Sequence, residues 1–184
     1  LREMEFNRLL SSAISAYGEP SLDGVEIGSK PKNNQKKIDR KEYHLIADSK
    51  EIDNWIKEAE EVGEVAFDTE TSSLDPHQAD LIGVSLSSKI GKACYIPIGH
   101  KSKKCLNKEI VLKKLKPLLE DSSIKKIGQN IKFDFIVLAK HGINISSMED
   151  TMLMSYVLDS GKNRHNMDTL SEIHLNHKTI SYKE

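Results

Sequence analysis

The spacing of apolar residues changes repeatedly between two periods from Tyr43 onward. An apolar residue at every second position predicts a strand, and apolar residues three or four positions apart predict a helix. The predicted strands are 43–47, 64–70, 81–87, 92–98, 124–128 and 143–145. The predicted helices are 49–62, 107–120, 130–141, 151–158 and 167–174. This order of elements indicates the α/β class, with a mixed sheet and helices packed on it.

Residues at the ends of these elements support the assignment. Ser49 is placed to cap the first helix and Gly63 to end it. Gly142 is placed to end the helix at 130–141, and the segment 87–91 suits a hairpin turn. The helix at 107–120 is expected to bury one apolar face, formed by Ile110, Val111, Leu115, Leu118 and Leu119.

The N-terminal part of the chain has a different composition. Residues 1–17 predict a short amphipathic helix, which Gly18-Glu19-Pro20 would end. The residues that follow are rich in Gly, Ser, Pro, Asn and Lys, a composition typical of linkers. We therefore expect a separate segment at 1–20, a linker at 21–42 and a folded domain from Tyr43 onward.

Composition narrows the class of protein. The chain has 184 residues, of which 30% are charged and 38% apolar, with a formal net charge of −1. These values are typical of a globular protein, and no apolar run is long enough to cross a bilayer. There is no signal-peptide pattern, and Cys94 and Cys105 lack metal-ligand spacing. Reduced thiols and a cytoplasmic location are therefore expected.

Positive charge is nevertheless clustered. The clustered lysines are Lys101, Lys103, Lys104, Lys108, Lys113, Lys114, Lys116, Lys125 and Lys126. Most of them are expected on solvated faces. The near-neutral net charge of the chain makes tight DNA binding by phosphate neutralisation alone unfavourable.

Two acidic residues are the most informative candidates for chemistry. Asp68 and Glu70 lie two positions apart at the end of the strand 64–70, so both side chains point to one face, with Cα atoms about 6–7 Å apart. Val65 and Phe67 then point to a core. Converging carboxylates are unfavourable unless solvent or a cation neutralises them, and a hard divalent cation takes such ligands readily. An Asp-x-Glu triplet is more commonly just an acidic strand end that lies in solvent.

A third acid, Asp134, follows the point where a predicted strand meets a helix. It falls about one turn into that helix, on the same face as Asn130. The helix dipole alone would favour an acid there, which is the structural alternative. The functional interpretation is that Asp134 faces Asp68 and Glu70 and completes a site for Mg²⁺ and a phosphate.

Together these segments resemble a known family. Phe67–Thr71 with Leu74 is similar to the first exonuclease motif of the DEDD superfamily, whose fold is RNase H-like, and Gln129–Asp134 is similar to the second. The resemblance is closest to the 3′–5′ proofreading domain of bacterial DNA polymerase I. Further similar runs are Tyr95–His100, Leu115–Asp121, Asp150–Leu153, Arg164–Leu170 and His177–Ile180. The resemblance to the proofreading domain covers residues 43–184. Residues 1–10 resemble the end of the 5′-nuclease domain that precedes it in the family.

The resemblance implies a metal-dependent nuclease. Asp68 would bridge two Mg²⁺ or Mn²⁺ ions, Glu70 would join it at the first, and Asp134 would hold the second. Two such ions, about 3.5–4 Å apart, activate a water and stabilise the leaving 3′ oxygen. The implied substrate is a single-stranded or frayed 3′ end of DNA, and the implied product is a deoxynucleoside 5′-monophosphate. The implied partners are the polymerase and 5′-nuclease domains of the same parent chain, with no membrane.

The resemblance also implies residues that contact the DNA end. Leu74 matches a hydrophobic wedge beside the terminal base, and Gln129 and Asn130 match residues that hydrogen-bond the terminal nucleotides. The other matched positions are Phe133, Arg164, Met167 and Tyr182, the last at a stacking aromatic. Stacking contributes about 1–3 kcal/mol per base without reading sequence. As alternatives, Leu74 could fold back on the core and Phe133 could face it.

The sequence departs from the family at its third motif, a tyrosine followed four residues later by an aspartate. No such pair occurs before Glu184, and Tyr156 has Ser160 at that spacing. In the family this aspartate is the fourth acid, and the tyrosine orients the attacking water. We therefore expect a C-terminally truncated fold and a fragment that binds divalent metal weakly. Such a fragment should have little or no exonuclease activity, whereas its parent should be active.

Two other functions stay open. One is a degenerate exonuclease domain that serves only as a structural spacer, which the presence of all three acids disfavours. The other is a stand-alone RNase D-like exonuclease acting on RNA, which the linker and the polymerase-like runs disfavour. His174 and His177 are expected to face solvent, and Asp150 and Asp168 to serve as helix caps or first-turn charges, not as metal ligands.

Overall fold

The computed structural model describes residues 4, 6–18, 40–101 and 104–180. The chain divides into two compact units, Leu1–Asn34 and Gln35–Glu184. In the first unit, helix α1 (Asn7–Tyr17) ends at Gly18, which has a φ of 78°. Residues 21–39 of the predicted linker and Tyr182 lie outside the described residues.

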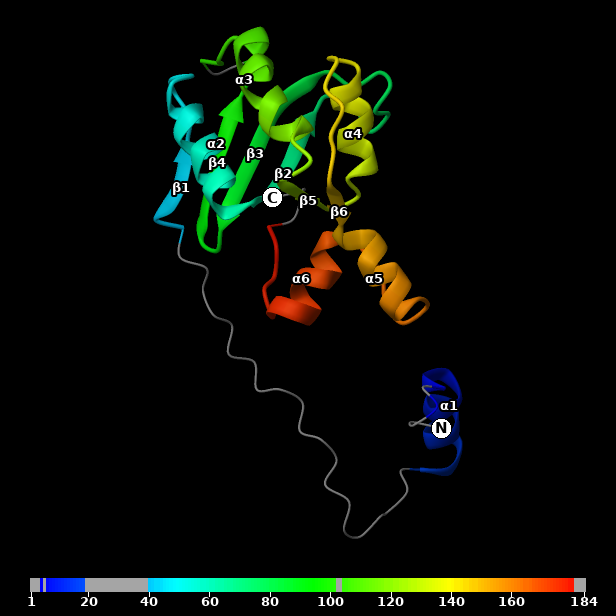
Figure 1. The fold of residues 1–184 in the computed structure, drawn as a ribbon. Coiled ribbons are helices and arrows are strands. Elements are labelled where there is room, and N and C mark those ends of the chain that lie inside the picture. The colour runs from blue at the N-terminus through cyan, green and yellow to red at the C-terminus, as the bar shows by residue number, and fades with distance from the viewer. Residues whose placement is uncertain (1–3, 5, 19–39, 102–103, 181–184) are drawn as a thin grey trace. The chain divides into compact units, whose positions relative to one another are not determined.

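The second unit is built on a six-stranded sheet in the order β1-β4-β3-β2-β5-β6 (Figure 1). The strands are β1 (Glu42–Leu45), β2 (Glu64–Thr71), β3 (Leu81–Lys89), β4 (Lys92–Pro97), β5 (Lys125–Gly128) and β6 (Met148–Asp150). β3 is antiparallel to both β2 and β4, whereas the outer pairs β1–β4, β2–β5 and β5–β6 are parallel. The predicted α/β class with a mixed sheet is confirmed.

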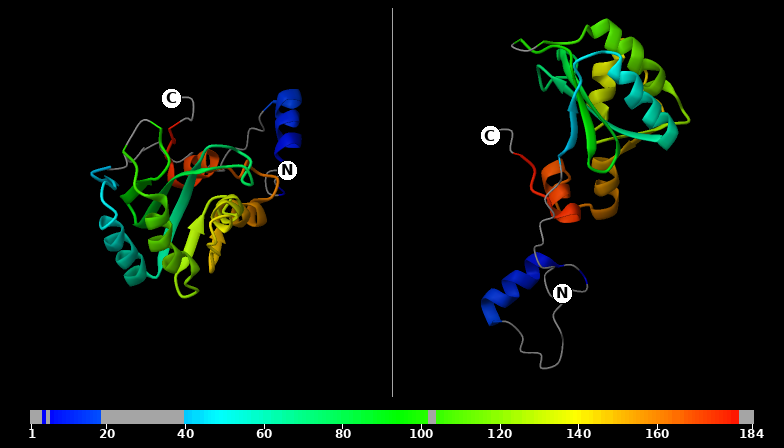
Figure 2. Two further views of the ribbon diagram at one scale, coloured as in Figure 1. Left: turned by 90° about the horizontal axis from the view of Figure 1, so that it is seen from above. Right: turned by 90° about the vertical axis from the view of Figure 1, so that its left-hand side faces the viewer.

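Helices cover the sheet unevenly. They are α2 (Glu51–Val62), α3 (Lys108–Glu120), α4 (Lys132–Ala139), α5 (Thr151–Asp159) and α6 (Met167–Leu175). Helices α2, α3 and α4 lie on one face, whereas α6 lies towards the other face, near one end of the strands (Figure 2). None of the helices in the described ranges is long and apolar enough to cross a membrane.

The core lies between the sheet and α2, α3 and α4. On β2, Val65, Phe67 and Thr69 are buried, as the strand alternation predicts for the first two. Cys94 on β4 is also buried and is a free thiol, as expected. The opposite side of the sheet, called the open face below, carries small and polar residues. These are Ala66, Asp68, Glu70, Gly83, Ser85, Ser87, Ala93 and Tyr95.

Two predictions about helices are wrong in detail. Ser49 does not cap α2, because the Asp48 carboxylate instead accepts the Lys50 N–H at 3.0 Å, and the Glu51 carboxylate accepts the Asp48 N–H at 3.0 Å. Ile110 is 48% exposed. It lies one position ahead of the buried residues Val111, Leu115, Leu118 and Leu119, so the helix turns its side chain towards solvent.

One further prediction fails near β5, and one of the clustered lysines is an exception to the expected exposure. The strand predicted at 143–145 is not formed: Ile143 and Ile145 are buried in a loop that does not pair with β5. The strand that pairs with β5 on the side away from β2 is Met148–Asp150. Lys126 is fully buried, although lysine runs usually lie on solvated faces. Its ammonium group donates to the main-chain carbonyls of Asp121 and Ile124, which replaces the water that a lysine normally binds.

Candidate active site

Asp68 and Glu70 lie on the open face where β2 extends past its neighbour β5. β5 pairs with β2 only from Glu64 to Ala66, so both acids follow the paired region. On the other side, Asp68 is opposite Ser85 and Glu70 is opposite Gly83, both on β3. Because Ser85 is small, the space above the Asp68 carboxylate is open to a ligand.

Asp134 reaches the same part of β2 from α4. Its side chain is 3% exposed, and its Oδ1 accepts the Thr69 main-chain N–H at 2.9 Å and the Thr69 hydroxyl at 2.5 Å. β5 has ended at this level, so the Asp134 carboxylate takes the place of a neighbouring strand. Thr69 has no role in the sequence analysis. The only signal for it is its place between Asp68 and Glu70.

The acids share an unfavourable electrostatic environment. Burial raises the pKa of Asp68 to about 6, and the charges of Asp134 and Glu70 add to this shift. Burial also raises the pKa of Asp134, while its hydrogen bonds from Thr69 act in the opposite direction. At neutral pH Asp68 therefore carries a charge that its surroundings disfavour. A cation bound beside it would relieve this repulsion.

The donor set of Asp68 and Glu70 fits a hard divalent cation. Mg²⁺ is usually held by one or two carboxylates and keeps several waters or substrate oxygens as its other ligands. Within the described ranges, no group of three or more His, Cys, Asp or Glu side chains encloses a potential metal position. Because Asp134 is engaged by Thr69, the Asp68–Glu70 pair is the part of the site that fits a cation directly.

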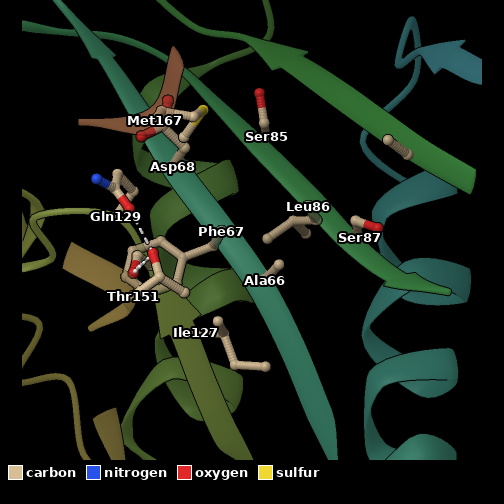
Figure 3. A pocket seen from close by; sticks show the side chains of 12 residues that line it. Ala66, Phe67, Asp68, Ser85, Leu86, Ser87, Ile127, Gln129, Thr151 and Met167 are labelled. Carbon is tan, nitrogen blue, oxygen red and sulfur yellow. Dashed lines mark hydrogen bonds between the residues drawn. The ribbon is translucent and has the colours of Figure 1, made fainter. Parts of the chain in front are cut away.

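A cavity of about 290 Å³ lies beside Asp68 on the open face (Figure 3). Small residues of the sheet line it, including Ala66, Ser85, Ser87 and Ala93. Met167 of α6 lies next to Asp68, and Gln129 and Thr151 lie together at another side of the cavity. A group bound in this cavity would therefore lie against the Asp68 carboxylate.

Gln129 is held by the protein itself. Its Nε2 donates to the His165 carbonyl at 2.8 Å, and its Oε1 accepts the Thr151 hydroxyl at 2.5 Å. Asn130 follows with a positive φ of 58°, a turn conformation between β5 and α4. In this structure Gln129 therefore shapes the wall of the cavity through its own protein contacts.

Asp150 connects the starts of two helices. Its carboxylate accepts the N–H groups of Met152 and Leu153 at 2.8 and 3.3 Å, so it is the N-cap of α5, as predicted. It also accepts the N–H groups of Asn130 and Ile131 at 3.1 and 3.0 Å, which lead into α4. One carboxylate thus fixes both helices that border the site.

The remaining residues implied by the resemblance are more dispersed. Leu74 is 97% exposed in the loop after β2, and Met167 is 51% exposed. Phe133 is half-buried and packs against the core, and Arg164 is exposed beside α5. Tyr182 lies outside the described residues.

The two histidines and Asp168, which the sequence does not favour as metal ligands, are placed much as expected. His174 is exposed, while His177 is half-buried. Asp168 lies in the first turn of α6, where its carboxylate accepts the Thr179 hydroxyl. The contact with Thr179 gives the Asp168 carboxylate a structural role at the start of α6.

Comparison with known proteins agrees with this site. Residues 43–184 match the sequence family described as 3′–5′ exonuclease. The chain belongs to this exonuclease family. DNA polymerase I from Pseudomonas aeruginosa is 39% identical to it over 189 residues, which cover 100% of this chain and 20% of that protein. The exonuclease chain therefore spans one-fifth of the length of this relative.

Solved structures share the fold. The chain resembles Brucella melitensis NrnC with bound Mg²⁺ with a TM-score of 0.56 and 31% identity, over 76% of this chain and 62% of that one. Trypanosoma brucei RNase D gives a TM-score of 0.63 at 14% identity, over 77% of this chain and 50% of that one. The second likeness concerns the fold alone. Both agree with the expected RNase H-like arrangement.

Proposed function

We propose that this exonuclease domain removes nucleotides from the 3′ end of DNA and holds Mg²⁺ through Asp68 and Glu70. The observation that carries the proposal is the placement of both carboxylates on the open face of β2, with Asp68 beside the cavity. Membership of the exonuclease family supports the reaction, and the polymerase relative supports DNA as the substrate. Two ions, with Mn²⁺ able to replace Mg²⁺, belong to the proposal as well.

A bound divalent ion would activate a water for attack on the terminal phosphodiester and stabilise the leaving 3′ oxygen. Asp68 is half-buried and is affected by the charges of both other acids, and it would hold both ions. Glu70 is exposed and can turn towards the first ion. Asp134 fixes Thr69 and with it the strand between the two ligands. Its charge also acts on Asp68, and it would hold the second ion partly through water.

The proposed DNA contacts surround this pair. Leu74 is exposed enough to act as the wedge, and Met167 lies where it can contact a nucleotide held against Asp68. Beyond its bonds to His165 and Thr151, Gln129 keeps a second Nε2 hydrogen and a second Oε1 lone pair that could bind a nucleotide. The other proposed contacts are Asn130, Phe133, Arg164 and Tyr182.

We propose that this domain works within a DNA polymerase I chain. The similarity to the polymerase relative extends over the whole sequence and covers one-fifth of the relative. In this proposal 1–20 belong to the preceding 5′-nuclease domain and 21–42 are a linker. The polymerase and 5′-nuclease domains are then the partners of the exonuclease domain, and a frayed or single-stranded 3′ end is its substrate.

The test uses the 184-residue chain in excess over 5′-labelled single-stranded DNA, with Mg²⁺, Mn²⁺ or EDTA. We expect slow, metal-dependent shortening from the 3′ end, because the sequence contains no Tyr-x-x-x-Asp motif to orient the water. Asp68→Asn should remove this activity. Glu60→Gln, an equal charge change on the exposed side of α2, should retain it. Shortening that persists in Asp68→Asn, or a chain that neither shortens DNA nor binds Mn²⁺, would contradict the proposal.

An RNA of the same sequence separates the remaining alternatives. The fold shared with RNase D motivates this comparison. Faster shortening of DNA than of RNA is expected, and a preference for RNA would favour the RNase D-like function. If the chain neither shortens any substrate nor binds divalent metal, the domain is a structural spacer.

A further inference from the structure

A second polar group lies on the open face next to Glu70. The Tyr95 hydroxyl on β4 is 2.6 Å from His100 Nε2, and the two rings meet edge to face with centroids 5.7 Å apart. Tyr95 is opposite Ser85, which in turn is opposite Asp68. Paired residues on neighbouring strands share a face. Tyr95 therefore lies on the face that carries the two acids.

Gly83 provides the space for the Tyr95 ring. Gly83 lies between Glu70 on β2 and Pro97 on β4, and a Cβ added to it would lie 2.0 Å from the Tyr95 hydroxyl oxygen. The hydroxyl thus occupies the place of the missing side chain. Opposite Cβ atoms on neighbouring strands are about 4.5–5.5 Å apart. The Tyr95 hydroxyl is therefore within reach of the Glu70 carboxylate.

The electrostatics agree with this proximity. Burial raises the pKa of Tyr95, and the Glu70 charge is the next largest cause of the increase. The remaining cause is Cys105, at the far side of the His100 loop. The charge of Glu70 therefore acts on the phenol, in agreement with its place on the same face of the sheet.

His100 is fixed through its main chain. Its N–H donates to Cys105 Sγ at 3.1 Å, and the Cys105 thiol donates to the His100 carbonyl oxygen at 3.4 Å. This double contact holds the imidazole against the phenol. A neutral imidazole donates from one ring nitrogen. When Nε2 carries the proton, it donates to the Tyr95 oxygen and leaves the Tyr95 proton free for another acceptor.

We propose that Tyr95, held by His100, is a positioning residue whose hydroxyl donates a hydrogen bond to the Glu70 carboxylate. The inference rests on the proposed role of Glu70 as a metal ligand. Glu70 is exposed, so its side chain loses rotamer freedom when it binds a cation. A donor that holds the carboxylate in its metal-binding rotamer reduces this loss, as hydrogen bonds to metal ligands commonly do. Tyr95 therefore acts on the metal through Glu70 and does not contact the substrate.

The experiment compares Mn²⁺ binding, followed by electron paramagnetic resonance, in the full chain and its variants. Tyr95→Phe keeps the ring over Gly83 and removes only the hydroxyl. We expect it to weaken Mn²⁺ binding by about ten- to a hundredfold with little change in unfolding temperature, the range typical for partners of metal ligands. Tyr43→Phe on β1, which is 48% exposed, is the matched control and should bind Mn²⁺ like the unsubstituted chain.

A second variant tests the same geometry without touching the tyrosine. Gly83→Ala places a methyl group where the Tyr95 hydroxyl lies and must displace it. It should therefore weaken Mn²⁺ binding in the same direction as Tyr95→Phe. Unchanged Mn²⁺ affinity in both Tyr95→Phe and Gly83→Ala would overturn the inference.

A metal-free readout separates this inference from the proposed function. In EDTA at neutral pH, Tyr95→Phe, Glu70→Gln and the double variant are unfolded with denaturant. If the hydroxyl donates to Glu70, the two substitutions are not additive, and the second has a smaller effect once the first is present. Additive effects would overturn the Tyr95 contact. Failure of the unsubstituted chain to bind Mn²⁺ would instead refute the proposed function, and this cycle would still decide the contact.

Discussion

The Asp134 carboxylate binds both hydrogen-bond donors of Thr69, the residue between Asp68 and Glu70. The two partners are 65 positions apart in the sequence, and the bond joins α4 to the unpaired edge of β2. It fixes the backbone from which both candidate ligands project. The geometry of the site therefore depends on Thr69, which neither binds metal nor contacts DNA in the proposed function.

Thr69→Val removes the hydroxyl but keeps the side-chain shape and the main-chain N–H. We expect the free energy of unfolding to fall by about 1.5–3 kcal/mol, since the lost hydrogen bond goes to a buried carboxylate. Thr69→Ser keeps the hydroxyl and serves as the control, with a smaller loss. Denaturant unfolding at pH 7 measures both. Equal stability of Thr69→Val and the unsubstituted chain would show that the bond does not hold the strand.

The raised pKa of Asp68 predicts how stability depends on pH without metal. Its pKa is about 6 in the folded chain, against an ordinary value of 3.8, so the folded state holds the proton more tightly. This contribution to stability is complete below about pH 4 and is lost as the pH rises through 6. Asp68→Asn, which is never charged, should therefore melt at a higher temperature than the unsubstituted chain at pH 7.5 in EDTA.

The same comparison at pH 4 provides the internal control. There Asp68 is largely protonated in the folded state, so the difference in melting temperature between Asp68→Asn and the unsubstituted chain should shrink markedly. A difference that is the same at both pH values would mean that repulsion among the acids is not its source.

Asp150→Ala should destabilise the domain more than a single helix cap does. Four main-chain N–H groups, at the starts of α4 and α5, lose their acceptor. A lost cap costs about 0.5–2 kcal/mol, and the value here should lie at or above the upper end of that range because two helix starts are affected. Asp168→Ala, in the first turn of α6, is the comparison and should cost about 0.3–1 kcal/mol. Thermal unfolding of both variants at neutral pH tests the ranking.

Leu74→Ala separates DNA handling from stability. Leu74 is 97% exposed, so its removal should leave the unfolding temperature unchanged. If Leu74 is a wedge, the variant should shorten the 3′ ends of duplex DNA more slowly, while single-stranded DNA is affected less. Ile90→Ala, at an equally exposed position in the β3–β4 turn, should change neither rate. Equal behaviour of the two variants on duplex DNA would rule out the wedge.

The sequence predicts the elements whose residues alternate cleanly between core and solvent. The β2 alternation places Val65 and Phe67 inside and Asp68 on the opposite face, as found. Prediction from the sequence fails where apolar residues are buried without strand pairing, as with Ile143 and Ile145. Periodicity indicates burial but not the strand partner. The burial of Lys126 is likewise not predictable from the sequence, because it depends on two carbonyls that only the fold brings together.

The candidate site is predictable only in part for the same reason. Asp68 and Glu70 are two residues apart, so strand geometry alone puts them on one face. The engagement of Asp134 by Thr69, and the packing of Tyr95 over Gly83, depend on how β2, β3, β4 and α4 meet. No local pattern encodes these distances. Sequence motifs therefore name the acids, while the sheet register identifies what positions them.

Binding of a divalent cation by Asp68 and Glu70 can be measured by a Mn²⁺ titration of the chain. Electron paramagnetic resonance would follow free Mn²⁺ for the unsubstituted chain, Asp68→Asn and the control Glu60→Gln at pH 7.5. We predict saturable binding that Asp68→Asn abolishes and Glu60→Gln leaves unchanged. Equal Mn²⁺ binding by Asp68→Asn and the unsubstituted chain would show that these carboxylates do not hold the cation.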